Sequence, residues 1–218
     1  MCRGELRRPR EVLAAKVNHV FPSAPDSVKI LSMSTLTTLP AVETRHIILR
    51  EIELRDAGAL SGFMTQEAYQ RHISLRLADE AEVKAFVARS VDRQGDERRN
   101  VFHLAAEEKY SGEAVGDGFL ILQRPRAPEI GWGVHPAMWN MGLGTEIGRA
   151  LLGLAFERLN ASKVWCKVMA GNEASAKLAR RIGMNFTQTL PNYPSGGGRF
   201  AAVDFYGMTA DNYFDQCY

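Results

Sequence analysis

The chain has 218 residues, of which 45% are hydrophobic and 24% charged, and these proportions fit one globular domain with or without a tail. Its formal net charge of +2 gives no reason to expect a nucleic-acid or membrane partner. Cys2, Cys166 and Cys217 are widely spaced and form no Cys-x-x-Cys pair, so we expect neither a metal site nor a disulfide framework, and a reducing, cytoplasmic compartment.

The N-terminal segment, residues 1–42, shows little periodicity and contains four prolines, so we interpret it as a flexible tail. Its basic start is not followed by an apolar core, which argues against a secretory signal. A natural start at Met33, with residues 1–32 as upstream sequence, is an alternative. We expect a single domain at 43–210 and a C-terminal tail at 211–218.

From residue 46 the pattern becomes regular, and strands and helices alternate in it. Asp79 is a good helix N-cap, and Glu82 lies three residues later as in a capping box. Predicted helices begin at Asp56, Asp79, Gly142 and Asn172, the last two ending near Leu159 and Ile182. Predicted strands are His46–Glu53, Val101–Ala106, Ala114–Gln123, Glu129–Val134, Val164–Met169, Met184–Leu190 and Arg199–Met208.

The segment from Trp139 to Glu146 follows a short strand and opens the longest predicted helix. Two glycines one residue apart, Gly142 and Gly144, allow the backbone to approach a bulky anion. A helix start supplies free N–H groups and the positive end of the macrodipole, so this segment can hold a phosphate without a lysine. The alternative is a tight turn that packs the helix on the strand.

A dinucleotide-binding fold is a rival interpretation, because Gly142, Gly144 and Gly148 resemble the NADP form of that fingerprint. Residues 135–141 separate these glycines from their strand, however. Only 70 residues follow Gly148, too few for a doubly wound sheet, and no acidic partner for a ribose is evident.

A second motif begins 30 residues after Gly142, where Asn172 opens the next helix. Asn172 is also a good plain N-cap. Ser175 shares a helix face with Leu178 and Ile182, so we expect its side chain to point inward from the first turn. The alternative for Ser175 is a small packing residue.

The two motifs together resemble the GNAT acetyltransferases over residues 48–208, and most closely their RimJ/RimL-type branch. That branch has Trp-Gly-x-Gly-x-Ala/Gly-Thr-Glu where this chain has Trp139 to Glu146. The family pattern Asn-x-x-Ser-x-x-Leu-x-x-Lys-x-Gly-Phe matches at Asn172, Ser175, Leu178 and Gly183, with Arg181 for Lys and Met184 for Phe. The resemblance implies an α/β (α+β) fold, with a mixed, mostly antiparallel sheet splayed between strands four and five and helices on both faces.

The resemblance also implies the substrates and several site residues. Acetyl-CoA is the expected co-substrate, and its acetyl group passes to an amine by direct attack. Ser175 is the candidate acid for the departing thiolate, because the tyrosine used elsewhere in the superfamily is replaced by Ala179. The expected cofactor-binding residues are Val134 or a neighbour for the acetyl carbonyl, the backbone of Met141, Gly142, Leu143, Gly144, Thr145 and Glu146 for the pyrophosphate, and Asn172 for the pantetheine arm.

The general base is open between Glu129, which begins the strand before the loop, and His135, whose ordinary pKa suits proton transfer. Related enzymes carry an acidic residue in the loop that is here Pro191–Gly198, which has none but contains Tyr193. That departure supports an alternative, a catalytically silent acyl-CoA sensor. Mid-strand Cys166 is expected to be inert. The acceptor is a protein N-terminus or a small-molecule amine, and the protein is expected to be a monomer or homodimer.

Overall fold

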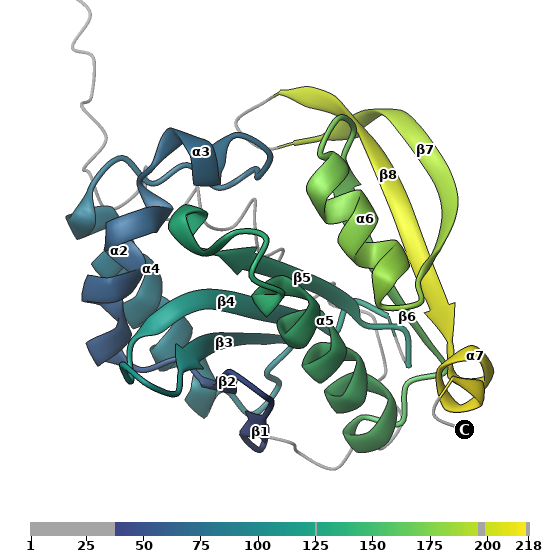
Figure 1. Ribbon diagram of the computed structural model, residues 1–218, viewed down its shortest axis with the longest axis horizontal. Coiled ribbons are helices and arrows are strands. Elements are labelled where there is room, and N and C mark those ends of the chain that lie inside the picture. The colour runs from purple at the N-terminus through teal and green to yellow at the C-terminus, as the bar shows by residue number, and fades with distance from the viewer. Residues whose placement is uncertain (1–37, 125, 196–198, 217–218) are drawn as a thin grey trace, which may run out of the picture.

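The computed structural model describes residues 38–124, 126–195 and 199–216, which form one mixed sheet with helices on both of its faces (Figure 1). The helices are α2 (Ala57–Met64), α3 (Glu67–Gln70), α4 (Glu80–Asp92), α5 (Leu143–Gly153), α6 (Glu173–Arg181) and α7 (Ala210–Asp215), with short helical turns η1 (Leu54–Asp56), η2 (Arg93–Gly95), η3 (Pro136–Met138) and η4 (Leu154–Arg158). The strands are β1 (Val42–Glu43), β2 (Ile47–Glu51), β3 (Val101–Glu108), β4 (Ala114–Ile121), β5 (Glu129–Val134), β6 (Lys163–Met169), β7 (Asn185–Pro194) and β8 (Phe200–Thr209).

The strand order is β1-β2-β3-β4-β5-β6-β8-β7. Every neighbouring pair is antiparallel except β5 and β6, which run parallel and share a single register pair, Glu129 with Trp165. The sheet therefore opens between β5 and β6, the fourth and fifth of the predicted strands. The expected mostly antiparallel, splayed sheet is confirmed, and it excludes the parallel doubly wound sheet of the rival dinucleotide fold.

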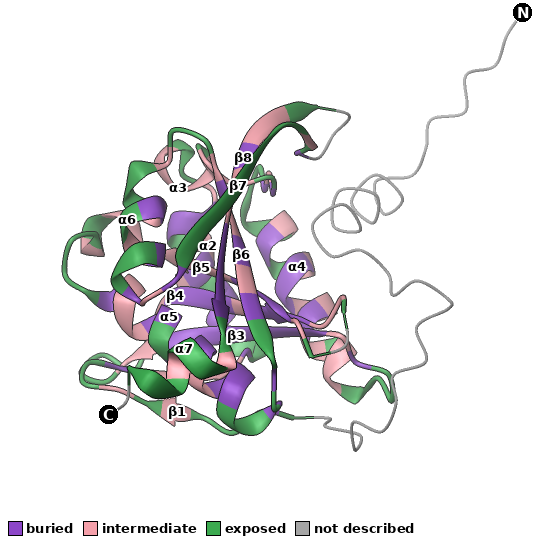
Figure 2. Cartoon of the chain, turned by 90° about the vertical axis from the view of Figure 1, so that its right-hand side faces the viewer, coloured by how far each residue is buried: buried purple, intermediate pink, exposed green. Residues whose placement is uncertain are grey.

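Two hydrophobic clusters cover the two faces of the sheet. One contains the inner face of α5, including Ile147 and Leu151, and the other contains Phe63 of α2 and Phe86 of α4. Figure 2 shows buried residues along the central strands, whereas β7 at the sheet edge is mostly exposed. None of the described helices combines the length and apolarity needed to cross a bilayer.

The predicted start of α4 is confirmed at Asp79, whose carboxylate accepts the N–H of Glu82 at 2.9 Å. The return contact differs from the expected capping box. The Glu82 carboxylate accepts the N–H of Ala78, one residue before the cap, at 2.9 Å. Both carboxylates still satisfy backbone donors at the helix start, which is the purpose of the motif.

The two segments predicted as tails are ordered where the structure describes them. Leu39 is buried in the core, and its N–H donates to Glu51. At the other end, α7 packs on η4 because the Tyr213 ring stacks on Phe156 at 4.7 Å and its hydroxyl donates to Glu157 at 2.6 Å. Apolar contacts that are distant in sequence therefore extend the domain beyond its predicted limits, while residues 1–37 and 217–218 of these tails lie outside the described residues.

Two predicted boundaries also move. The strand expected to end at Leu190 continues to Pro194, because register shifts in its pairing with β8 accommodate the proline-containing stretch. The helix expected over residues 142–159 is α-helical only to Gly153 and continues as the π-helical turn η4. The first of these changes brings Tyr193 into the wall of the site described next.

Candidate active site

The gap between β5 and β6 leaves backbone donors of β5 without a neighbouring strand. His135 donates its N–H to Val115 on the β4 side at 2.8 Å, and backbone groups alternate in direction along a strand. The N–H groups of Trp132 and Val134 must then face the gap. Val134 also accepts a hydrogen bond from the Trp139 indole at 2.8 Å, which ties the following loop to the strand end.

At the end of the gap, α5 begins with a left-handed residue. Gly142 has φ of 88°, and an added Cβ there would meet open space. The N–H groups of Thr145 and Glu146, expected to bind pyrophosphate, instead donate to the Gly142 carbonyl at 2.9 and 3.2 Å. Leu143 and Gly144 begin the helix, so their N–H groups have no acceptor one turn back and remain suited to an anion.

The other glycines of the motif have a packing role that the sequence did not indicate. A Cβ on Gly144 would lie 2.5 Å from a methyl carbon of Leu178, and one on Gly148 would lie 2.9 Å from a methyl carbon of Ile182. Both glycines therefore permit the close approach of α5 and α6. This contact explains the NADP-like glycine spacing without a dinucleotide.

The Glu146 side chain also has a structural task. Its carboxylate accepts hydrogen bonds from Thr44 at 2.5 Å and from the His46 N–H at 3.0 Å, and contacts the His46 imidazole at 2.5 Å. Partial burial opposes ionisation, but these bonds outweigh it and lower the pKa of Glu146. Glu146 thus joins the first turn of α5 to the segment between β1 and β2.

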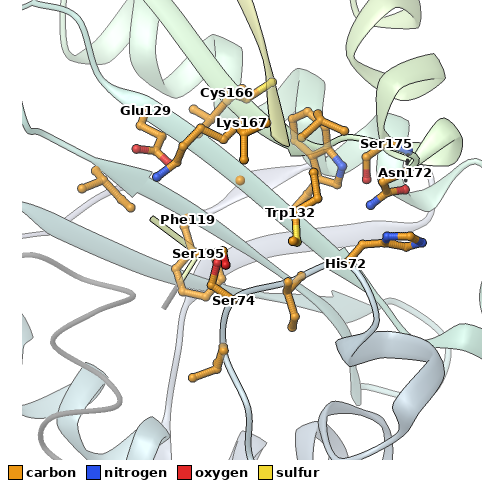
Figure 3. Close-up of a pocket in the computed structure, with 18 of the residues that line it drawn as sticks. His72, Ser74, Phe119, Glu129, Trp132, Cys166, Lys167, Asn172, Ser175 and Ser195 are labelled. Carbon is orange, nitrogen blue, oxygen red and sulfur yellow. Dashed lines mark hydrogen bonds and ion pairs between the residues drawn. The ribbon is translucent and has the colours of Figure 1, made fainter. Parts of the chain in front are cut away.

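A cavity of about 480 Å³ opens along the gap, within the size range of small-molecule sites. Asn172 and Ser175 line it from the start of α6, and Glu129 lines it from β5, on the opposite side in Figure 3. Asn172 is also the N-cap of α6, accepting the N–H of Ser175 at 3.2 Å. The structure thus brings both α6 motif residues to the cavity.

Glu129 is paired with a cation that the sequence analysis missed. Lys167 on β6 lies 3.0 Å from one oxygen of Glu129, and Gln123 donates to the other at 3.3 Å. Burial raises the pKa of Glu129, and the attraction of Lys167 only partly opposes this shift. Burial lowers the pKa of Lys167, but Glu129 and Tyr193 together more than reverse the effect. The sequence did not mark Lys167 as a site residue, because its position fits the ordinary alternation of a strand and its partner, Glu129, lies on another strand.

His135 does not line the cavity. Its Nδ1 accepts the N–H of Ala137 at 3.0 Å, which caps η3, and its ring packs 5.1 Å from that of Phe63. Cys166 contributes to the cavity wall but is buried, and desolvation raises the pKa of its thiol. A protonated, buried thiol is a poor nucleophile.

A buried polar cluster formed by residues of α3, β3 and β4 was also missed by the sequence analysis. Asp117 of β4 is fully buried and lines the cavity together with Tyr69 of α3, whose hydroxyl donates to it at 2.8 Å. His103 of β3 lies 3.2 Å from the other oxygen of Asp117. The available signal in the sequence was His103 and Asp117, which lie on two consecutive predicted strands and could therefore have been expected to meet.

Solved structures resemble this chain over most of its length. The GNAT acetyltransferase of Bacillus anthracis has a TM-score of 0.70 with 16% identity, covering 79% of this chain and 99% of its own. RimL, described as a ribosomal L7/L12 alpha-N-protein acetyltransferase in complex with coenzyme A, has a TM-score of 0.69 with 17% identity. The match covers 79% of this chain and 99% of the RimL chain. At these identities the likeness establishes the fold.

The class of protein follows from the sequence of the domain. The family profile for the acetyltransferase (GNAT) domain matches residues 46–185. The uncharacterised N-acetyltransferase YoaA of Bacillus subtilis (strain 168) is 27% identical over 156 residues, 71% of this chain and 88% of its own length. The chain belongs to the GNAT family, and it is an acetyltransferase.

Proposed function

We propose that this acetyltransferase moves the acetyl group of acetyl-CoA directly to a primary amine while both substrates are bound. The observation that carries the proposal is the gap between β5 and β6. Free N–H groups of Trp132 and Val134 face it, the α5 N-terminus lies at one end, and the cavity lies alongside. This arrangement offers a path for an extended thioester from an anion site at the start of α5 to the cavity.

The cofactor-binding residues follow that path. The N–H groups of Met141, Gly142, Leu143 and Gly144 bind the pyrophosphate, helped by the positive end of α5. The Val134 N–H or that of Trp132 donates to the acetyl carbonyl, where negative charge develops during attack. The Asn172 amide contacts the pantetheine arm, and Thr145 and Glu146 support the loop through their bonds to Gly142 and to the β1–β2 segment.

The chemistry needs few further groups. Holding thioester and amine together removes much of the entropic barrier. The amine nitrogen attacks the acetyl carbon, loses a proton, and expels the CoA sulfur with the C–S electron pair. Ser175, in the cavity wall beside Asn172, passes a proton to the thiolate and regains one from solvent.

Glu129 enters the proposal on the acceptor side of the cavity. Its raised pKa is suited to a general base, but both of its oxygens are already engaged by Lys167 and Gln123. The Glu129→Gln variant distinguishes two roles. If Glu129 is the general base, kcat of the variant falls. If Glu129 binds the acceptor, the KM of the variant for the acceptor rises. For His135 to act as base, it would have to release Ala137 and turn toward the cavity.

The acceptor is a protein N-terminus or a small-molecule amine. Similarity to RimL, which is described as an alpha-N-protein acetyltransferase, supports the first. The volume of the cavity, about 480 Å³, supports the second. A panel of short peptides, amino acids and polyamines, assayed by release of free CoA thiol, discriminates between them.

Thermal denaturation with acetyl-CoA, free CoA or NADPH tests the proposal first, because a ligand that binds only the folded state raises Tm. We expect acetyl-CoA and CoA to raise Tm and NADPH to leave it unchanged. Stabilisation by acetyl-CoA without turnover of any amine would favour the acyl-CoA sensor. A Tm that acetyl-CoA does not change would refute the proposal.

A further inference from the structure

A chain of hydrogen-bonded side chains crosses the domain from α4 to the cavity. Ser90 of α4 contacts His103 Nδ1 at 2.9 Å, His103 Nε2 contacts Asp117 Oδ2 at 3.2 Å, and Asp117 Oδ1 accepts the Tyr69 hydroxyl at 2.8 Å. Ser90, His103 and Asp117 are buried, and Tyr69 reaches the cavity wall. Such a buried polar network is costly unless every member is satisfied.

The hydrogen bonds of this network converge on Asp117. Ser90 Oγ lies 3.1 Å from the Phe86 carbonyl and 2.9 Å from His103 Nδ1, within hydrogen-bond distance of both. A hydrogen on Nε2 lets His103 donate to Asp117 Oδ2, because two lone pairs at 3.2 Å would repel. Asp117 thus accepts from His103 at one oxygen and from Tyr69 at the other.

The cavity end of the network lies against β5 at the reaction site. A Cβ on Gly133 would overlap both Tyr69 Oη and Asp117 Oδ1, so the hydroxyl sits directly over this glycine. Gly133 lies between Trp132 and Val134, whose N–H groups face the thioester path. Since Tyr69 donates its hydrogen to Asp117, the lone pairs of Oη remain for a donor in the cavity.

We propose that Tyr69 is the catalytic residue that removes the proton from the acceptor amine, with Asp117 as the positioning residue that receives it and His103 as the positioning residue that orients Asp117. The inference rests on the proposed acetyl transfer. After the nitrogen attacks the acetyl carbon, its proton passes to Tyr69 Oη as the phenol proton passes to Asp117 Oδ1. His103 keeps its Nε2 hydrogen directed at Asp117 Oδ2 throughout. The C–S electron pair leaves with sulfur, and the network returns its added proton to solvent after product release.

Three features favour this route over Glu129. Glu129 lies four residues from Gly133, about 13 Å along an extended strand. Its carboxylate is occupied by Lys167 and Gln123. The Tyr69 phenol is held neutral, because burial first and then the Asp117 charge raise its pKa well above the ordinary value, and a neutral phenol can relay a proton while remaining neutral itself. Glu129 and Lys167 are left to bind the far end of the acceptor.

The test compares Tyr69→Phe with Glu129→Gln, using an acceptor on which the wild type turns over. Tyr69→Phe keeps the ring that packs on Phe63 and removes only the hydroxyl. We expect kcat to fall about 100-fold or more, as for loss of a general base, with an unchanged KM for acetyl-CoA. Glu129→Gln should retain kcat and raise the acceptor KM. Stabilisation by acetyl-CoA, measured on each variant, shows that the fold and the thioester site persist.

Asp117→Asn provides a second, nearly isosteric variant if Tyr69→Phe does not fold. It keeps an oxygen for Tyr69 but cannot hold the transferred proton, so kcat should fall while the KM for acetyl-CoA stays unchanged. A Tyr69→Phe enzyme with kcat within twofold of the wild type, or a 100-fold loss in Glu129→Gln alone, would overturn the inference. If the wild-type protein binds acetyl-CoA but acetylates no amine, the proposed function and this inference are both refuted. If the wild type turns over and the Tyr69→Phe and Asp117→Asn variants keep the wild-type kcat, the inference alone is refuted.

Discussion

Among the glycines that the structure describes, Gly133 is the one whose added Cβ would make the shortest contact, so Gly133→Ala should produce a severe local conflict. The new methyl group would overlap the Tyr69 hydroxyl and the Asp117 carboxylate, and it would lie 2.9 Å from a ring carbon of Tyr69. Asp117 is completely buried and cannot move into solvent. The hydrogen bond between these two side chains must therefore break or lengthen.

The cost follows from two contributions. A hydrogen bond to a charged group contributes about 1.5–3 kcal/mol. Displacing packed atoms to admit a methyl group costs a further 1–3 kcal/mol or so. We therefore expect the free energy of unfolding to fall by roughly 2.5–6 kcal/mol. For a domain of this size, that corresponds to a decrease in Tm on the order of 5–24 °C.

Gly131→Ala is the matched control, because Gly131 lies two residues away on the same face of β5 and its added Cβ would meet no atom within 4 Å. Replacing glycine where alanine fits changes stability by only about 0.4–1 kcal/mol, usually upward. Urea and thermal denaturation of the two variants measure the difference. Equal unfolding midpoints for Gly133→Ala and Gly131→Ala would refute the reasoning.

Three further predictions concern helix ends and the α5 turn. Gly183→Ala should cost more than about 1–2 kcal/mol, because Gly183 has φ of 93° and little surrounding space, and an unchanged urea midpoint would contradict this. Asn172→Ala should cost about 1 kcal/mol through loss of the α6 cap, while Asn172→Asp should retain it in the same urea assay. The lowered pKa of Glu146 means that its stabilisation is present above the ordinary carboxyl pKa and is lost as pH falls through the lowered value. The stability difference between wild type and Glu146→Gln should thus shrink between pH 7 and pH 3, and a constant difference would argue against the contacts with Thr44 and His46.

Much of the architecture was readable from local patterns. Strand β5 has the predicted bounds, and α4 begins at the predicted cap, Asp79. These elements are determined by side chains near in sequence: period-two alternation for the strand, and a cap with an apolar stripe for the helix. The paired motifs at Gly142 and Asn172 indicated the family for the same reason, since each is a continuous stretch whose backbone geometry depends on its own residues.

Prediction failed where a residue's role depends on distant partners. The order of Leu39 and of α7 comes from contacts with the core that no local pattern reveals. The sequence offered only the phosphate-binding reason for a glycine at position 144, and it did not reveal that the missing Cβ there leaves room for Leu178 of another helix.

By itself, the sequence determined most of the strands and helices, the glycine turn at the start of α5 and the membership of the GNAT family, because each depends on a continuous stretch of residues. Only the tertiary structure decided which ionisable groups meet. It paired Glu129 with Lys167 across the open edge of the sheet, and it joined Tyr69, Asp117 and His103 from a helix and two strands. The protonation of such groups depends on their burial and on charged or polar neighbours about 3 Å away. Neither can be read from the distance between residues along the chain.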